Sequence, residues 1–136
     1  MWGERVGLNA SREPKCAALA VGVDLVEIRR VAALAERYGE RFKGRVFTQA
    51  ERTDCSDRPE SLAARWAAKE AVAKALGTGF GPVSFREVEL LRECAGQPEL
   101  RLNGKARALA EARGLHSWAV SVSHDGGFAI AFVVAT

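Results

Sequence analysis

The stretch RWAAKEAVAKALGTG, residues 65–79, predicts a helix that runs directly into a glycine-rich loop. We expect the helix to begin near Pro59 and to end at Gly77, because proline suits the first helical turn and glycine suits the C-terminal cap. Alanines make this helix small on nearly all sides: Ala63, Ala64, Ala67, Ala68, Ala71, Ala73 and Ala75. Such a helix can pack closely against its neighbours, and we expect it to be the long central helix of the fold.

Two charged residues within this helix allow two interpretations. Glu70 and Lys74 are four residues apart, so they share one face of the helix. They could form a solvent-exposed ion pair, which contributes only about 0.3–0.5 kcal/mol. Alternatively, Glu70 binds a ligand, because a closely packed helix has little room for an uncompensated carboxylate. The loop GTGFG, residues 77–81, would offer backbone N–H groups to such a ligand, but it lacks the Lys-Ser/Thr ending of a Walker motif.

Length and composition indicate a single globular domain. The chain has 136 residues, of which 48% are hydrophobic and 27% charged. We expect residues 1–17 to form a loosely ordered leader and residues 18–136 to form one domain. The net charge of +3 permits an acidic partner, but it selects no particular class of partner.

The cysteine pattern favours a reducing compartment. Cys16, Cys55 and Cys94 are odd in number and widely spaced, and they match no zinc or disulfide motif. The apolar runs are too short to cross a membrane, and the first residues lack the features of a signal peptide. We therefore expect a cytoplasmic protein with no membrane partner.

Capping patterns predict where the first helices begin. A strand is expected over Ala18–Asp24, followed by a helix that Asp24 would cap, with Glu27 completing a capping box. Gly39 is the expected end of that helix. A second capping box, Thr48 with Glu51, predicts another short helix.

The second half of the chain predicts strands and one more helix. Residues 83–91 and 98–102 are strand-like around a turn, residues 103–114 have a helical pattern, and residues 117–124 and 128–134 form a hairpin around DGG. The fold class is therefore α+β, with a small, mostly antiparallel sheet packed against helices.

Asp24 and His124 are the other candidate site residues. Asp24 could be only a helix cap, or it could be a magnesium ligand at a strand end, since Mg²⁺ prefers oxygen ligands. His124 could be a hydrogen-bonded residue at the end of a strand, or it could contact a phosphate or transfer a proton. The run SVSHD, residues 121–125, fits a Ser–His–Asp triad poorly, because no nucleophile elbow is present.

Arginines align along the first predicted helix. At 100° per residue, Arg30, Arg37 and Arg41 fall in one narrow sector if the helix extends that far, and Leu34 lies near it. This face could be merely solvated, or it could bind an acidic helix of a partner. A nucleic-acid module is the rival interpretation, but the chain lacks interleaved aromatics and a recognition helix, so we expect no nucleic-acid partner.

Together, GVDLVEI, FTQAE, LAARWAAKEAVAKALGTGFG and VSVSHD resemble, in order and spacing, the motifs of the holo-acyl-carrier-protein synthases. These are the short bacterial type of 4′-phosphopantetheinyl transferase, and the resemblance covers about residues 19–134. It implies the 4′-phosphopantetheinyl transferase fold. It also implies transfer of phosphopantetheine from coenzyme A to a serine of an apo acyl carrier protein or carrier domain, with release of adenosine 3′,5′-bisphosphate. The pathway implied is fatty acid or polyketide biosynthesis.

The resemblance also implies roles for individual residues. Asp24 and Glu70 would hold Mg²⁺, and Lys74 would bind a phosphate or steer the proton of the attacking serine. Arg65 would meet the 3′-phosphate of coenzyme A. Further contacts with the coenzyme are implied for Gly77, Thr78, Gly79, Ser123 and His124.

The resemblance further implies how the protein assembles and what it binds. His124 would reach the coenzyme from an adjacent subunit, because this type of enzyme is similar to a homotrimer with active sites between subunits. The arginine face would bind the acidic carrier protein through Arg30, Leu34, Arg37 and Arg41.

Two positions depart from related patterns. The larger transferases carry Asp-x-Glu at the first metal position, whereas Val26 stands two residues after Asp24, so a water is expected there. Asp125 follows His124 where many relatives have a hydroxyl residue, and its charge would repel phosphate.

The general base stays open between Glu70, Lys74 and a magnesium-bound water, of which we favour the water. A magnesium-dependent nucleotide hydrolase with the same carboxylates is a second rival.

Overall fold

The structure is a computed structural model that describes residues 18–92 and 96–136. Its largest sheet has three antiparallel strands in the order β1 (Ala20–Glu27), β5 (Phe128–Ala135) and β4 (Trp118–Asp125). β5 is therefore central, and β1 and β4 form the two edges. The predicted leader, Cys16 and Cys94 lie outside the described residues.

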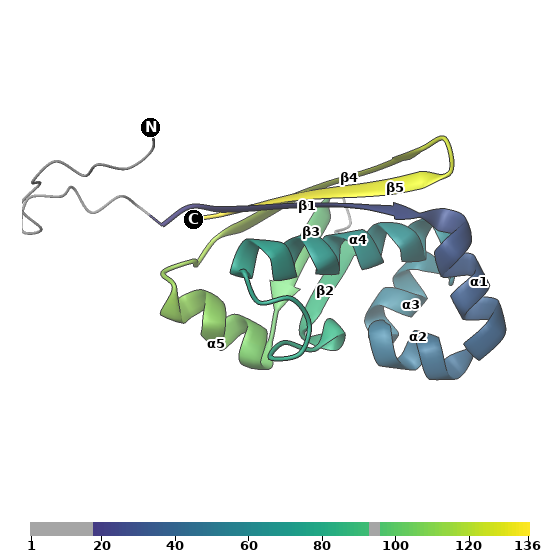
Figure 1. Ribbon diagram of the computed structural model, residues 1–136, viewed down its shortest axis with the longest axis horizontal. Coiled ribbons are helices and arrows are strands. Elements are labelled where there is room, and N and C mark those ends of the chain that lie inside the picture. Colours follow the sequence, from purple (N-terminus) through teal and green to yellow (C-terminus); the bar gives the residue numbers. More distant parts are fainter. Residues whose placement is uncertain (1–17, 93–95) are drawn as a thin grey trace, which may run out of the picture.

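The alanine-rich helix α4 (Pro59–Leu76) lies along one face of this sheet (Figure 1). It approaches β1 so closely that a Cβ atom on Gly22 would lie 1.9 Å from the carbonyl oxygen of Ala71. Only glycine is compatible with such a contact. Ala67, Ala68 and Ala71 are fully buried in the interface between helix and sheet. The expected close packing of this helix is confirmed.

The remaining elements lie on the same side of the sheet as α4 (Figure 1). Three short helices gather at one end: α1 (Ile28–Tyr38), α2 (Glu40–Val46) and α3 (Gln49–Cys55). A second, two-stranded antiparallel sheet pairs β2 (Val88–Arg92) with β3 (Pro98–Leu102). A 3₁₀ turn, η1 (Phe85–Glu87), precedes β2, and α5 (Gly104–Ala112) follows β3. The expected α+β class is therefore confirmed.

The predicted start of the first helix is wrong. Asp24 lies within β1, which continues to Glu27, because the ladder to β5 supplies strand partners along that whole length. α1 begins at Ile28, and the Glu27 side chain makes no capping bond. The predicted end is confirmed, since Gly39 follows Tyr38 with a φ of 52°.

A break at Gly39 also changes the predicted arginine stripe. Arg30, Leu34 and Arg37 lie on α1, whereas Arg41 lies on α2, which the sequence pattern did not predict as a separate helix. The single-helix alignment of Arg41 with the others is therefore wrong. The capping box at Thr48 is confirmed, because its hydroxyl accepts from the Glu51 N–H while the Glu51 carboxylate accepts from the Thr48 N–H.

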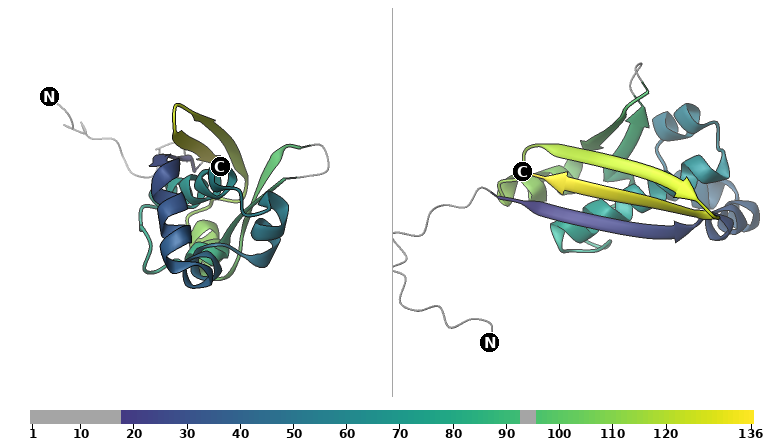
Figure 2. Two further views of the ribbon diagram at one scale, coloured as in Figure 1. Left: turned by 90° about the vertical axis from the view of Figure 1, so that its right-hand side faces the viewer. Right: turned by 90° about the horizontal axis from the view of Figure 1, so that it is seen from above.

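The face of the three-stranded sheet opposite α4 is apolar and carries no helix within residues 18–92 and 96–136 (Figure 2, right). Along β1 and β5, buried or half-buried residues facing α4 alternate with exposed, outward-facing ones. The exposed apolar side chains here are Val21, Val23, Leu25, Phe128, Ile130 and Phe132. None of the described helices is long and apolar enough to cross a membrane.

Candidate functional site

Asp24, Glu70 and Lys74 come together where α4 crosses the β1 edge of the sheet. The Lys74 ammonium donates to Asp24 Oδ1 at 2.9 Å and to the carbonyl oxygen of Val23 at 3.0 Å. In the described part of the chain, Lys74 forms its ion pair with Asp24 and not with Glu70. The structure therefore does not contain the surface ion pair between Glu70 and Lys74 that was one of the two interpretations.

The carboxylate of Glu70 is under-compensated. Burial raises its pKa above the ordinary value, and the negative charge of Asp24 raises it further. Lys74 and Arg30 oppose that shift without cancelling it. Two carboxylates that repel each other in a half-buried position favour the binding of a cation. We call Asp24, Glu70 and Lys74 the acidic cluster.

The acidic cluster suits magnesium better than a metal held entirely by protein. Within the described residues, no group of three or more His, Cys, Asp or Glu side chains is arranged to hold a metal. Zinc sites normally need at least three such protein ligands. Mg²⁺ often takes only one or two carboxylates and completes its octahedron with water and substrate phosphates.

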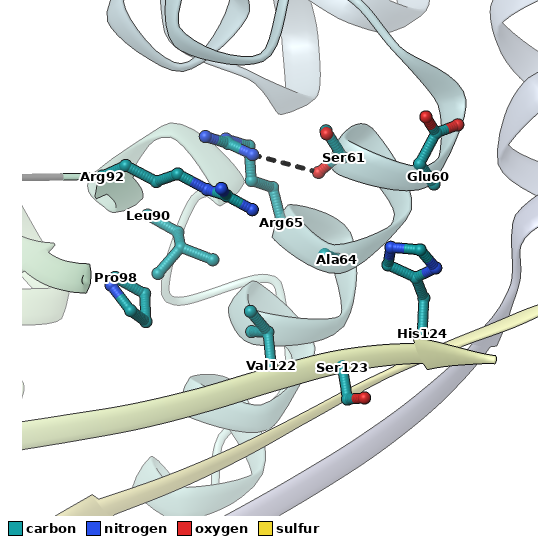
Figure 3. A pocket seen from close by; sticks show the side chains of 10 residues that line it. All are labelled: Glu60, Ser61, Ala64, Arg65, Leu90, Arg92, Pro98, Val122, Ser123 and His124. Carbon is teal, nitrogen blue, oxygen red and sulfur yellow. Dashed lines mark hydrogen bonds between the residues drawn. The ribbon is translucent and has the colours of Figure 1, made fainter. Parts of the chain in front are cut away.

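A cavity of about 300 Å³ lies at the opposite, β4 edge of the sheet. It lies between the N-terminal half of α4 and strands β2, β3 and β4 (Figure 3). Its lining includes Arg65, Arg92 and His124. These three nitrogen-bearing side chains outnumber the one carboxylate in the lining, Glu60, and therefore favour an anionic ligand. We call it the basic pocket.

Arg65 has an incomplete set of partners in this pocket. Its side chain is only 4% exposed, and it donates to the carbonyl oxygen of Ser61 at 3.2 Å and to the carboxylate of Asp54. Its Nε is the one fully buried side-chain nitrogen or oxygen without a hydrogen-bond partner among the described residues. A buried N–H of a guanidinium is costly to leave unpaired.

His124 and Ser123 point in different directions from β4. Figure 3 shows the His124 ring directed toward α4, whereas the Ser123 side chain lies on the other side of the strand. The structure therefore places His124 in one pocket with Arg65. Asp125, whose carboxylate would repel an anion, is not among the residues that line this pocket.

The two sites are separate within one chain. Arg65 and Glu70 are five residues apart on α4, so their side chains point about 140° from each other around the helix axis. β1 and β4 are the two edges of the sheet, with β5 between them. The structure thus brings the predicted site residues together as two groups and not as one.

The glycine-rich loop begins at the Lys74 end of α4. Gly77 has a φ of 72° and caps the helix, and Gly79 has a φ of 64°. The hydroxyl of Thr78 donates to the carbonyl oxygen of Gly79 at 3.0 Å. These positive φ values are the conformation for which glycine is favoured.

Sequence reasoning missed several residues that shape the two sites. It assigned no role to Gly22 in the close approach of β1 and α4, or to Arg92 and Asp54 beside Arg65. It also missed that Glu51, beyond its capping role, forms a fully buried ion pair with Lys69 at 2.6 Å. The sequence did contain one signal for these partners. Arg65 and Lys69 are charged residues on a helix of mostly small side chains, and charges buried on such a helix need partners.

The arginine face of α1 is exposed and continues into an apolar groove. Arg30 and Arg37 are exposed. Leu34 and Arg41 line a groove of about 360 Å³ between α1, α2, α4 and η1. Trp66 and Phe85 form part of its wall. Of the predicted partner-binding residues, Leu34 of α1 and Arg41 of α2 thus line one groove, whereas Arg30 and Arg37 are not among its lining residues.

Comparison with known proteins gives consistent results. The family model described as the 4′-phosphopantetheinyl transferase superfamily matches residues 20–133. A holo-[acyl-carrier-protein] synthase of Herpetosiphon aurantiacus is 50% identical over 123 residues, covering 85% of this chain and 97% of the relative. The Gloeobacter violaceus protein of that name is 47% identical over 117 residues, covering 83% of this chain and 89% of the relative.

Solved structures share the fold. The crystal structure of Helicobacter pylori holo-[acyl-carrier-protein] synthase in complex with coenzyme A superposes with a TM-score of 0.78. It is 32% identical and covers 85% of this chain and 99% of that chain. The complex of ACPS with CoA from Chronobacterium ammoniagenes gives a TM-score of 0.74 at 40% identity, covering 88% of this chain and 97% of that chain.

Proposed function

The chain belongs to the 4′-phosphopantetheinyl transferase superfamily, and we infer that its acidic cluster and basic pocket serve holo-acyl-carrier-protein synthase activity. In this reaction a serine of an apo acyl carrier protein attacks the β-phosphorus of coenzyme A. The phosphopantetheine arm moves to the serine oxygen, and adenosine 3′,5′-bisphosphate leaves. One observation carries the assignment to these residues. Asp24 of β1 meets Glu70 and Lys74 of the distant helix α4 at one point, in a chain about 50% identical to such a synthase.

Asp24 and Glu70 would hold Mg²⁺. When bound, the metal would neutralise the diphosphate of coenzyme A as negative charge moves to the leaving group. The raised pKa of Glu70 supports this role, because a nearby cation would relieve the repulsion between the two carboxylates. The number of carboxylates also fits, since substrate phosphates supply other ligands of magnesium.

Lys74 would bind the diphosphate on the same side. Its side chain is 57% exposed, so the ammonium can turn from Asp24 toward an incoming phosphate oxygen. The loop residues Gly77, Thr78 and Gly79 follow within one turn and would line the pocket beside it. Lys74 would thereby orient the phosphate for attack by the carrier serine.

Arg65 and His124 would bind the 3′-phosphate end of coenzyme A in the basic pocket. The support is the anion-favouring lining of the pocket and the unpartnered Nε of Arg65. Ser123 would contribute less than His124, because its side chain lies on the other side of β4 (Figure 3). The two phosphate-binding groups belong to opposite edges of the sheet, so one coenzyme molecule would need both edges.

A homotrimer with active sites between subunits would satisfy that need. In a cyclic assembly, the acidic cluster of one subunit would face the basic pocket of the next. The open apolar face of β1 and β5 supports assembly, since monomers rarely leave such a surface exposed to water.

The carrier protein would bind along α1 and α2. Arg30, Arg37 and Arg41 supply positive charge for an acidic helix, and Leu34 supplies an apolar contact at the adjoining groove. The carrier could belong to fatty acid or polyketide biosynthesis. We place the reaction in the cytoplasm, because the buried Cys55 is a free thiol and the other cysteines are few and far apart in sequence.

Intact-mass spectrometry of an apo carrier protein tests the proposal. We expect the carrier to gain the mass of one phosphopantetheine after incubation with the protein, coenzyme A and Mg²⁺. No gain on several apo carriers, with the protein shown to be folded, would contradict it. Turnover of coenzyme A without any carrier would instead indicate a nucleotide hydrolase.

A further inference from the structure

Two carboxylates on α3 bind the free edge of strand β2. Glu51 and Asp54 are three residues apart, so they lie on the same face of the helix. Glu51 Oε2 accepts from the backbone N–H of Leu90 at 3.1 Å, and Asp54 Oδ2 accepts from that of Arg92 at 3.1 Å. The carboxylates therefore take the place of a neighbouring strand on the side of β2 that faces away from β3.

Each carboxylate also binds a cation from α4. Lys69 pairs with Glu51, and Arg65 pairs with Asp54. The result is two parallel connections between β2, α3 and α4. We call Leu90–Glu51–Lys69 the inner rung and Arg92–Asp54–Arg65 the outer rung.

The inner rung is complete. The Lys69 ammonium has three donors and uses them on Glu51 at 2.6 Å, on the carbonyl oxygen of Phe85 at 2.9 Å and on that of Val88. The side chains of Lys69 and Glu51 have no exposure to solvent. Burial lowers the pKa of Lys69, and the charge of Glu51 opposes that shift. With every donor used, this rung serves the packing of the fold.

The outer rung is incomplete and borders the basic pocket. The Asp54 side chain is 27% exposed, and Arg65 Nε has no partner. Arg65 and Arg92 both line the pocket. The outer rung therefore differs from the inner rung in one respect: its cation, Arg65, keeps an N–H donor without a partner and lines a cavity.

We propose that Asp54 is a positioning residue that sets specificity for the 3′-phosphate of coenzyme A. It fixes the Arg65 guanidinium in one orientation and holds the Arg92 backbone beside it, so that both cations face the pocket. This inference rests on the proposed function, in which Arg65 binds the 3′-phosphate. Asp54 acts through Arg65, since its own charge would repel the phosphate.

A competing account makes the opposite prediction. If Asp54 only competed with the phosphate for Arg65, removing the Asp54 carboxylate would free the guanidinium and strengthen phosphate binding. If Asp54 orients Arg65, its removal leaves a mobile guanidinium whose fork no longer matches the phosphate oxygens. The preference for coenzyme A over 3′-dephospho-coenzyme A distinguishes the two accounts.

The test compares kcat/KM for coenzyme A and for 3′-dephospho-coenzyme A in wild type and Asp54→Asn. Asparagine keeps an oxygen for the Arg92 N–H and loses the charge that holds Arg65. We expect the ratio of the two kcat/KM values to fall about tenfold, because small misplacement of a binding group is costly. The fall should appear in KM for coenzyme A, whereas kcat at saturation and KM for the dephospho compound stay within about twofold. A merely structural defect would affect both substrates equally.

Asp57→Asn is the matched control. Asp57 follows the same helix and pairs with Lys43 and Arg52, away from the basic pocket. We expect its substrate ratio to equal that of wild type. An unchanged or increased ratio in Asp54→Asn would overturn the proposal.

Arg65→Lys separates failure of this inference from failure of the proposed function. If Arg65→Lys leaves the substrate ratio unchanged, the assignment of Arg65 to the 3′-phosphate and the role of Asp54 both fall, whereas synthase activity itself is judged by the mass gain of the carrier. If Arg65→Lys lowers the ratio and Asp54→Asn does not, only the role of Asp54 falls. Should Asp54→Asn fail to fold, Asp54→Glu keeps the charge but shifts it by one methylene, and the same fall in ratio is expected.

Discussion

The two edges of the three-stranded sheet carry opposite kinds of chemistry. At the β1 edge, Asp24 and Glu70 repel each other, and Lys74 pairs with Asp24 but offsets the charge of Glu70 only in part. At the β4 edge, Arg65 and His124 line a pocket in which a buried N–H has no partner. One edge favours a cation and the other favours an anion.

One helix supplies side chains to both edges, and this explains why neither edge is complete. α4 presents Glu70 and Lys74 on one side and Arg65 on another. A substrate with a metal-binding diphosphate and a separate phosphate would need both edges at once. Since one chain holds them apart, we expect an active site shared between subunits, as proposed above.

Glu70→Gln should have the largest effect, and it acts on the β1 edge alone. We expect kcat to fall about 10³-fold, the scale for losing one group that stabilises charge in the transition state. Phosphopantetheine transfer measured by intact mass checks this, with thermal unfolding of the same sample as a test of folding. Glu111→Gln, which breaks an exposed pair with Arg107, is the control and should keep full activity. If Glu70→Gln kept wild-type activity, Glu70 would not bind a cation that the reaction requires.

Glu51→Gln should have the largest effect on stability. Glu51 belongs to the inner rung, which lies inside the fold and is part of neither edge. The substitution leaves the Lys69 charge fully buried without its counter-charge, which costs about 3–5 kcal/mol. We expect Tm to fall by roughly 10–20 °C in scanning calorimetry. Glu40→Gln, in the exposed pair with Arg52, should change Tm by no more than about 3 °C. A similar small change for both variants would show that the buried pair is not structural.

His124→Ala tests the β4 edge and should have a moderate effect. Its expected result is a rise of about tenfold in KM for coenzyme A with little change in kcat, since the group would bind the phosphate end remote from the reacting atoms. Steady-state kinetics with coenzyme A as the varied substrate measures this. A fall in kcat at unchanged KM would instead place His124 in the chemistry.

The smallest expected effect is the pH dependence of stability at the β1 edge. Because the pKa of Glu70 is raised in the folded protein, its contribution to stability is present below about pH 4.5 and is lost as the pH rises. Without metal, Glu70→Gln should therefore unfold at a higher Tm than wild type at pH 7. That difference should shrink toward pH 4. A lower Tm for Glu70→Gln at pH 7 would mean that the carboxylate stabilises the fold.

Local sequence patterns correctly predicted the features that depend only on residues close together in the chain. The capping box at Thr48, the glycine end of α4 and the pairing in both hairpins follow from short-range periodicity and turn residues. The strand predicted over residues 83–91 is wrong in its first half, because residues 85–87 form a 3₁₀ turn and β2 begins at Val88. Asp24 was misjudged, because Asp followed by Glu three residues later is a capping pattern. In the structure the partner strand β5, about a hundred residues away in sequence, extends β1 through both residues.

Lys69 and Glu70 show what sequence could not separate. They are adjacent in the chain, yet Lys69 is fully satisfied inside the fold, whereas Glu70 lies under-compensated beside Asp24. Their partners come from distant segments, so no local spacing distinguishes the structural charge from the site residue. The resemblance to a family predicts Glu70 as a site residue, whereas the partners of Arg65 and Lys69 became visible only in the fold.

Mixing two variants tests most directly whether the two edges form one active site between subunits. Glu70→Gln lacks the β1-edge function and His124→Ala lacks the β4-edge function. In a randomly re-associated 1:1 mixture, about a quarter of the sites of a cyclic assembly would combine an intact Glu70 with an intact His124. At a coenzyme A concentration below the KM of His124→Ala, we predict recovery to about a quarter of wild-type transfer. A mixture no more active than the separate variants would contradict the account.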